Sequence, residues 1–518
     1  MRASKTNQKA SILLLTLAAC CARVFAAGWA GKTLEELRQI VYSEASTRLV
    51  DLGQITDGDG NLERLYMSPA HKQAAHQIQA WMDGIGLHTS LDGVANVRGR
   101  LQGKYPEQPA WLMGSHYDTV VDGGFFDGAL GVIAAIAAVK ALLLEAAMQT
   151  GVISPIDARS VAHGQKQLQE AVKAPLDSLL PAPVEIIAFS EEEGLRFQST
   201  FLASQAVTGS LATSGLLDAK DAGGLSLMEL LRQEGLAQTP ADLSKSSINP
   251  EHIAGYVEVH MEQGPVLEAM GKPLGVVTGI AGQSRLSVSM QGIQGHAGTV
   301  PMGLRRDPLA GAAEAIQQIE QICNGGPEAA GQTPRGPFAK DTSLVCTVGS
   351  MTIWPGSSNV IPGVVNFTID IRSQDDEVRR NVISTVRQNI DSRCSRRQLQ
   401  CSVERRNEVQ AVPCNADIVE QLAAAAANVQ GISSSSAAAG KGMATSPVPR
   451  LVSGAGHDAM AMASITKMGM MFVRCAGGIS HSSLENVTKE DISTAVAALH
   501  DFLRSAVGRI DLTAHQEL

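Results

Sequence analysis

Apolar strands alternate with helical patterns along most of this chain, and this alternation limits the folds open to it. Residues 110–113 form an apolar run that predicts a buried strand, and a helical pattern from Leu130 to Leu144 follows shortly after it. Another apolar strand is predicted at 184–189. Such alternation favours an α/β architecture, in which layers of helices cover a sheet. Open α/β sheets place their chemistry at the carboxyl ends of their strands, so the residues that follow each strand are candidate functional residues.

The order of the predicted elements changes between residues 285 and 406. Strands and helices there follow the order β-α-β-β-α-β, which is typical of a ferredoxin-like module. The predicted strands are 286–291, 343–354, 364–372 and 400–405, and the predicted helices are 307–323 and 375–392. We therefore expect a second domain at 285–406, inserted into an α/β domain made of residues 28–284 and 407–518.

Histidines and carboxylates gather where the predicted strands end. Each has an ordinary explanation when taken singly, because polar strand ends and solvated acidic loops are common. Together they form a mixed nitrogen and oxygen set that suits Zn²⁺ or Mn²⁺, whereas a soft thiolate site is not indicated. The set consists of His116, Asp118, Asp127, Glu192, Glu193, His260 and His481.

The spacing within this set indicates how the chemistry would be divided. His116 and Asp127 are predicted metal ligands, and Asp118 would be the carboxylate that orients the histidine. Glu192 and Glu193 are adjacent, so one can bind metal while its neighbour serves as general base. A carboxylate shared by two ions is how two-metal hydrolases hold the attacking water. The chain has no Gly-x-Ser-x-Gly elbow, and no motif surrounds a candidate nucleophilic cysteine, so a covalent mechanism is disfavoured.

Four short motifs contain all of these residues except His481. They are Gly-Ser-His-Tyr-Asp-Thr at 114–119, Asp-Gly at 127–128, Glu-Glu-Gly at 192–194 and His-Met-Glu-Gln-Gly-Pro at 260–265. Together they resemble the metal-dependent amidohydrolase branch of the M20 peptidase family. That branch holds N-carbamoyl-L-amino-acid, ureidoglycolate and allantoate amidohydrolases, and the resemblance runs from about residue 34 to residue 503. Within the branch, the segments 188–202, 453–462 and 472–475 most resemble the allantoate-hydrolysing enzymes of plants and algae.

The resemblance implies a fold and a set of metal ligands. The fold would be an M20-type catalytic α/β domain with an inserted ferredoxin-like domain that serves as lid and dimer interface. Two metal ions per subunit are implied, Mn²⁺ or alternatively Zn²⁺, with Asp127 bridging them. His116 and His260 would complete one site, and Glu193 and His481 would complete the other.

Catalytic and substrate-binding roles are also implied by the resemblance. Glu192 would be the base that activates water, with Asp118 supporting it. His296 would reach a neighbouring subunit's site and stabilise the developing oxyanion. The remaining substrate-binding positions would be Gln283, Asn359 and Arg372, of which the arginine is the natural bidentate partner for a substrate carboxylate.

The activity that the resemblance implies is hydrolysis of the ureido group of allantoate to ureidoglycine, ammonia and carbon dioxide. The partners would be a small ureide substrate and a second copy of the chain. An N-carbamoyl-L-amino-acid or ureidoglycolate amidohydrolase would keep the same ligands and differ only in the pocket, so both alternatives stay open. A catalytically silent, metal-stabilised dimer that binds a ligand is the alternative of another class.

Charge and the first residues bear on partners and location. The 42 basic and 51 acidic residues give a net charge of −9, so no basic footprint for nucleic acid is present. Arg2, Lys5 and Lys9 precede an apolar core at 12–21, which predicts a secretory signal peptide over residues 1–27 and entry into the endoplasmic reticulum. That core is too short for a comfortable membrane span, and we expect no membrane partner. A transit peptide to an organelle is the alternative, because no acidic residue precedes Glu35.

Two segments lack a regular pattern, and the cysteines show no recognisable arrangement. Residues 146–183 and 431–445 show no clear period, and we expect a looped surface insertion and a linker there. Six cysteines remain after removal of the signal peptide, and their spacing forms neither a zinc pattern nor a disulfide lattice. Cys394 and Cys401 could pair in an oxidising compartment, with buried free thiols as the alternative.

Overall fold

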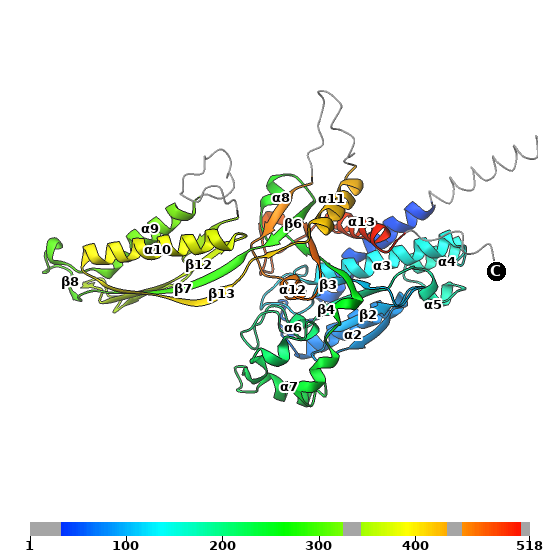
Figure 1. The fold of residues 1–518 in the computed structure, drawn as a ribbon, viewed down its shortest axis with the longest axis horizontal. Coiled ribbons are helices and arrows are strands. Elements are labelled where there is room, and N and C mark those ends of the chain that lie inside the picture. The colour runs from blue at the N-terminus through cyan, green and yellow to red at the C-terminus, as the bar shows by residue number, and fades with distance from the viewer. Residues whose placement is uncertain (1–32, 325–342, 432–447, 509–518) are drawn as a thin grey trace, which may run out of the picture. The chain divides into compact units, whose positions relative to one another are not determined.

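The computed structural model describes residues 33–324, 343–431 and 448–508, and the chain divides into two units. The first unit runs to Val276 and takes in Asp417–Pro449 and the chain from Ala461 onward, while Val277–Ala416 and Arg450–Met460 form the second (Figure 1). The chain crosses from one unit to the other within β6 (Leu274–Ile280). The predicted signal peptide and all but one residue of the predicted linker lie outside the described residues.

A mixed sheet forms the centre of the first unit. Strand β3 runs parallel to β4 and β5, and β16 runs parallel to β5, so these four strands have their carboxyl ends at the same edge. Strands β4 and β16 are buried along their whole length, as expected for parallel strands covered on both faces. In sheet order the strands are β1 (His88–Leu91), β2 (Val97–Leu101), β4 (Val184–Phe189), β3 (Ala110–His116), β5 (Ile253–Met261) and β16 (Met468–Val473).

Helix α3 (Ala129–Gln149) is the core helix of this unit and packs against β3, β5 and α13 (Lys489–Ala506). By length and composition it is the one helix among the described residues that could cross a membrane, but its apolar stretch is entirely buried within the structure. A helix that is apolar on all sides needs such surroundings, and here the protein interior supplies them. Further helices of this unit are a first helix at 33–53, α2 (Pro69–Gly84), α6 (Leu202–Val207), α7 (Leu227–Gln233), α8 (Val266–Ala269) and α11 (Ala416–Val429). The short helix α12 (Asp458–Met462) begins in the second unit and ends in the first.

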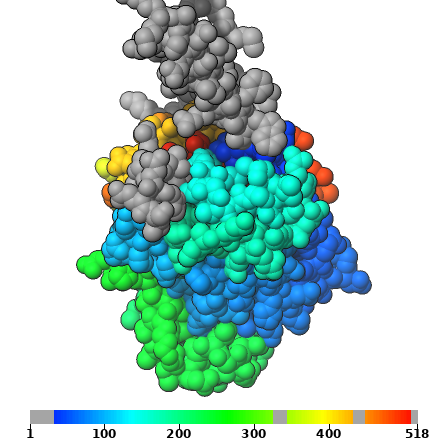
Figure 2. Space-filling model, turned by 90° about the vertical axis from the view of Figure 1, so that its right-hand side faces the viewer, coloured from blue at the N-terminus to red at the C-terminus, as the bar shows by residue number. Residues whose placement is uncertain are grey.

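The segment at 146–183 is a correction to the predicted loop. It contains α4 (Pro155–Ala162), which Ser154 caps by accepting a hydrogen bond from the backbone N–H of Asp157, and α5 (Leu168–Ala171). Apolar side chains from both helices are buried, and Figure 2 shows this part of the chain in cyan on the surface that faces the viewer. Helices of eight and four residues are too short to produce a periodic pattern, which explains the wrong prediction.

The second unit has the predicted β-α-β-β-α-β order. Its sheet runs β10-β12-β7-β13 with antiparallel neighbours, which is the ferredoxin-like arrangement. Asp307 and Asp375 cap the two helices by accepting hydrogen bonds from backbone N–H groups of the first turn. The elements are β7 (Gly282–Gln291), α9 (Pro308–Cys323), β10 (Met351–Trp354), β12 (Val364–Ser373), α10 (Asp376–Arg397) and β13 (Gln400–Val409).

The predicted strand 343–354 is divided into two strands. β9 (Val345–Thr347) and β10 both pair with β12, but Thr347 lies opposite Asp370 whereas Met351 lies opposite Phe367. Four residues on one side therefore span three on the other, which is the signature of a bulge. The apolar pattern alone contained no sign of this extra residue.

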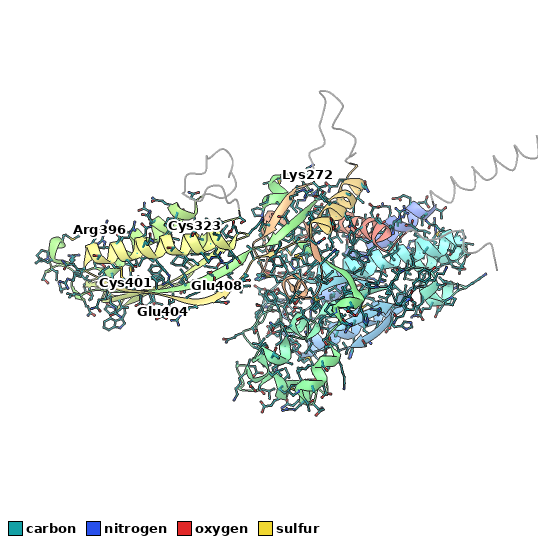
Figure 3. The ribbon with its side chains drawn as sticks, viewed as in Figure 1. Lys272, Cys323, Arg396, Cys401, Glu404 and Glu408 are labelled. Atoms are coloured by element: carbon teal, nitrogen blue, oxygen red, sulfur yellow. A yellow bond between two sulfur atoms is a disulfide. The ribbon has the colours of Figure 1, made fainter. Side chains whose placement is uncertain are left out.

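Two disulfides lie in the second unit. Cys394 and Cys401 form a disulfide, which confirms the predicted pairing over the alternative of free thiols. This bond joins the end of α10 to the start of β13. A second bond joins Cys323 at the end of α9, which is labelled in Figure 3, to Cys346 in β9. This bond was not predicted, because only the packing of that helix on the sheet brings the two residues together. Cys475 is a buried free thiol.

A buried carboxylate ties three helices of the first unit together. Glu145 of α3 lies 2.7 Å from Nη2 of Arg38 and 3.2 Å from Nε of Arg504. His500 lies between Glu145 and the hydroxyl of Tyr42, at 3.2 Å and 2.7 Å. Burial by itself would raise the pKa of the Glu145 carboxyl, but the hydrogen bond from His500 and the charge of Arg38 outweigh it and lower that pKa to about 2.

Replacement of Glu145 with glutamine should lower the thermal stability of the protein in a pH-dependent way. Because the folded-state pKa lies below the ordinary 4.5, the stabilisation is complete above that pH and disappears as the pH falls toward 2. The difference in melting temperature between the unmodified protein and the variant should therefore be smaller at about pH 3 than at about pH 7, and thermal unfolding at both pH values measures it. Glu36→Gln, which removes an exposed ion pair with Arg159, is the control. A gap of constant size across this range would contradict the expectation.

Candidate metal centre

Asp127 lies at the centre of the predicted site, immediately before α3. Its Oδ1 atom is 3.2 Å from Nε2 of His260 and 3.9 Å from Nε2 of His116, and its Oδ2 atom is 3.2 Å from Nε2 of His481. His116 is the last residue of β3 and His260 is close to the end of β5. Because these strands are parallel neighbours, the fold itself brings both imidazoles to one edge of the sheet.

The start of α3 comes very close to the imidazole of His116. Gly128 adopts φ +64°, and a Cβ atom on it would collide with the ring of His116. Glycine is therefore required here both for the left-handed backbone conformation and for the close approach. This explains why glycine follows Asp127 at the point where the carboxylate of Asp127 meets the histidines.

Glu193 and His481 complete a second group around the same carboxylate. Their Oε1 and Nε2 atoms are 3.4 Å apart. Burial raises the pKa of the Glu193 carboxyl to about 7, with repulsion from Asp127 contributing and the positive charge of His116 opposing. Asp127 behaves in the opposite way, because the imidazoles of His260 and His481 outweigh its burial and hold the pKa of its carboxyl well below the ordinary value.

Asp118 makes the contacts that its predicted orienting role requires. Its Oδ1 atom lies 3.3 Å from Nδ1 of His116, on the side of the ring opposite Nε2. Its carboxylate also accepts hydrogen bonds from the backbone N–H groups of Glu192 and Glu193, at 3.1–3.2 Å. One buried side chain thus holds both a histidine and the loop that carries the two glutamates.

The residues present fit a pair of divalent cations. Oδ1 of Asp127 is buried without a hydrogen-bond donor, so a positive centre is the partner that it lacks. Three groups within the first unit have ligand atoms that all lie within 4.8 Å of one another: His116–Asp127–His260, Asp127–Glu193–His481 and His116–Glu192–Glu193. The first two are the predicted ligand sets, and they share Asp127. Imidazole and carboxylate donors in this proportion suit Zn²⁺ and Mn²⁺ equally.

Three further side chains hold Asp127 and were not predicted. The Oε1 atom of Glu485 accepts hydrogen bonds from the backbone N–H groups of Phe126 and Asp127, both at 2.9 Å. Gln263 and Ser480 donate to Oδ2 of Asp127 at 3.0 Å and 3.1 Å. Gln263 lies within the recognised 260–265 motif, whereas Glu485 carries only the weak signal of a carboxylate four residues after a predicted ligand.

His296 and Asn359 lie near each other in the second unit. His296 is in β8 (Gly295–His296), which pairs with β11 (Val360–Ile361), and Asn359 immediately precedes β11. The backbone N–H of Ala297 donates to the carbonyl of Asn359 at 2.9 Å. Both side chains are exposed, so each is available to a ligand.

Gln283 and Arg372 face each other on neighbouring strands of the second unit. β7 and β12 are in a register that pairs these two residues directly. Both side chains contact Asp370, which the sequence pattern had not singled out as a site residue. The structure therefore places the two predicted substrate-binding residues together around one carboxylate.

Comparison with known proteins is consistent with this geometry. The model of the family described as "Peptidase family M20/M25/M40" matches residues 168–505. The chain belongs to this family. Its relatives include a probable allantoate deiminase of Oryza sativa subsp. japonica, 44% identical over 481 residues that cover 92% of this chain and 91% of the relative. An N-carbamoyl-L-amino-acid amidohydrolase of Pseudomonas sp. is 34% identical, with 86% of this chain and 92% of the relative covered.

Solved structures of the family extend the comparison to the fold. An amidase of the hydantoinase/carbamoylase family from Burkholderia multivorans has a TM-score of 0.73 at 27% identity, and 90% of this chain and 98% of that chain are covered. The two-unit α/β architecture is therefore that of M20 amidohydrolases. Membership in the family also agrees with a metal centre at the carboxyl ends of the sheet strands.

Removal of individual ligands should change the metal content in a stepwise manner. Asp127→Asn should lose both ions because both ligand sets contain it, whereas His481→Ala should lose one. The number of ions bound per subunit is measured by inductively coupled plasma mass spectrometry after gel filtration. Asp122→Asn makes the same chemical change on the same turn at an exposed residue and should retain both ions. Two bound ions in the Asp127 variant would refute the bridging assignment.

Proposed function

We propose that this protein hydrolyses a ureido group of allantoate, giving ureidoglycine, ammonia and carbon dioxide. The observation that carries the proposal is the pair of ligand sets meeting at Asp127, on a chain whose relatives named as allantoate deiminases are 43–44% identical over about nine-tenths of its length. Such an enzyme acts on carbon–nitrogen bonds other than peptide bonds and belongs to ureide catabolism.

Glu192 is the residue to which we assign proton transfer. Two Mn²⁺ ions, with Zn²⁺ as the alternative, would supply Lewis-acid activation of water and of the ureido carbonyl when bound. Glu192 is almost buried, and its backbone is held by Asp118 beside His116 and Glu193. Its carboxylate would accept a proton from the attacking water and deliver it to the departing nitrogen, which leaves as ammonia. The remaining N-carboxylate then loses carbon dioxide.

The second unit would supply the contacts that recognise the substrate. Arg372 would bind the allantoate carboxylate through two parallel hydrogen bonds. Gln283 and Asn359 would bind ureido groups through their side-chain amides. His296 would stabilise the oxyanion that develops on the attacked carbonyl.

Hydrolysis of an N-carbamoyl-L-amino acid is the second candidate. It is favoured by relatives that bear this name and are 34% identical to this chain. Such substrates also combine a ureido group with a carboxylate, so the same ligands and the same base would serve. The difference would lie in the pocket around the second ureido group of allantoate.

Ammonia release from the two substrates tests the proposal. The metal-stripped protein, refilled with Mn²⁺, should release ammonia from allantoate and not from N-carbamoyl amino acids. Glu192→Gln should lower turnover by at least about 100-fold, which is the scale of general acid–base catalysis, and should retain its metal. Release from carbamoyl amino acids alone would reject allantoate as substrate. Full turnover by the Glu192 variant would remove the assigned base.

We also propose that the protein forms a homodimer through the second unit. β10 is an edge strand of the sheet in that unit, and Trp354 at its end is 62% exposed. Ile353 beside it is exposed as well, and exposed apolar side chains on an edge strand invite pairing with another chain.

Introduction of a charge at this edge should separate the subunits. Trp354→Glu should sediment as a monomer while the unmodified protein sediments as a dimer. Tyr105→Glu places the same charge on an exposed aromatic position of the first unit and should leave the dimer intact. A Trp354 variant that remains dimeric would place the interface elsewhere.

For location, we propose the secretory pathway, with the endoplasmic reticulum as the compartment. The Cys323–Cys346 and Cys394–Cys401 disulfides support this, because disulfides persist in oxidising compartments. Microscopy of a fluorescent fusion determines the compartment, and N-terminal sequencing of the mature protein determines whether the predicted signal peptide is removed. A mature chain found inside another organelle would favour the transit-peptide alternative.

A further inference from the structure

Asp370 lies among three basic or polar side chains on one face of the second unit's sheet. Its Oδ2 atom is 2.6 Å from Nε2 of Gln283 and 3.3 Å from Nε of Arg285, both on β7. Arg372, two residues along β12, donates from Nε to Oδ1 at 2.9 Å and from Nη2 to Oδ2 at 3.3 Å. The alternate residues Ile369 and Ile371 are buried in the core of the unit, so these polar side chains share the opposite face.

The hydrogen bonds of Arg372 leave a defined part of its guanidinium available. Of its five N–H groups, two donate to Asp370 and one on Nη1 donates to the carbonyl of Gly454 at 2.6 Å. Two N–H groups therefore remain, one on each terminal nitrogen. This is the number that a carboxylate needs for a bidentate pair.

The contact with Asp370 also decides which end of the Gln283 side chain is presented. Burial would raise the pKa of the Asp370 carboxyl, but the hydrogen bond and charge of Arg372 outweigh it and lower that pKa. The ionised carboxylate only accepts hydrogen bonds, so the amide nitrogen of Gln283 must face it. The carbonyl oxygen of Gln283 is then directed away from Asp370 and is an acceptor for the N–H groups of a ureide.

The charges in this group match a substrate with one carboxylate. Arg285 and Arg372 contribute two positive charges and Asp370 one negative charge, which leaves a net charge of +1. Without Asp370, two neighbouring arginines would repel each other, and the guanidinium of Arg372 would lose the contact that fixes its plane.

We propose that Asp370 is the positioning residue for substrate recognition: it fixes Arg372 to bind a substrate carboxylate and Gln283 to accept hydrogen bonds from a ureido group. This inference rests on the proposed function. It attributes the preference of the enzyme for ureides that carry a carboxylate to Asp370, a side chain that does not itself contact the substrate. Asp370 therefore governs affinity and selectivity, and the chemical step at the metal centre does not depend on it.

The test is the steady-state kinetics of Asp370→Asn with allantoate. The KM should rise by about 10- to 100-fold, as expected when a charge-assisted contact that orients the arginine is lost, while kcat changes by less than about threefold. The uncharged carboxamide analogue of allantoate supplies a readout that a merely structural role would not move. The unmodified protein should prefer allantoate over this analogue, and the variant should lose most of that preference.

Two further variants make the result specific. Asp370→Glu retains the charge and should recover part of the affinity for allantoate. Glu404→Gln is the matched control, because it also neutralises one carboxylate on the same sheet. Glu404 lies on β13 (Figure 3), and among the ion pairs of the described residues it contacts only the exposed Arg406. This variant should leave KM unchanged. Melting temperature and metal content are measured for each variant to confirm that the fold and the metal centre are intact.

The contrary outcomes are distinct from a failure of the proposed function. A lowered kcat at unchanged KM, or an unchanged preference for allantoate over its carboxamide, would overturn the role of Asp370. Absence of turnover of any ureide by the unmodified protein would refute the proposed function instead. In that case calorimetric binding of glyoxylate, a small carboxylate, decides the inference: weaker binding by Asp370→Asn supports it and equal binding overturns it.

Discussion

The structure depends on a carboxylate buried among three imidazoles. Asp127 has a ring nitrogen from each of His260 and His481 at 3.2 Å and a third from His116 at 3.9 Å, and its own side chain is only 8% exposed. A buried charged group is costly unless it is balanced, and two cations shared by this carboxylate would balance its charge. The parallel strands, the glycine at the start of α3 and the support from Glu485 all serve to place this one side chain.

Much of the architecture follows from local patterns that tertiary packing reinforces. β4 occupies the predicted residues and α9 does so to within one residue, because an apolar run and an amphipathic repeat each have only one good environment in an α/β layer. The predicted ligands converge because parallel strands end together, which chain order already indicates. The roles of His296 and Asn359 came from resemblance, since no local pattern marks an exposed histidine as functional.

The features that were missed share a physical cause. α4 and α5 are too short to show a period, and the extra residue between β9 and β10 changes register without changing composition. The Cys323–Cys346 bond and the contacts of Asp370 and Glu485 exist only after helices and strands have packed. Partners of this kind are chosen by three-dimensional proximity, and spacing along the chain carries almost no information about them.

Among the described residues, both disulfides lie in the second unit, and the candidate ligand groups that contain Asp127 or Glu193 lie in the first. The two units would therefore depend on different chemical conditions. Formation of the disulfides in the second unit depends on the thiol–disulfide potential of the compartment. Occupancy of a metal centre in the first unit would depend on the free concentration of divalent cations. A change in the redox potential would therefore affect the second unit first, and a change in the supply of divalent cations would affect the first unit first. Chaperones and proteases would then encounter a chain in which one unit is stabilised and the other is not.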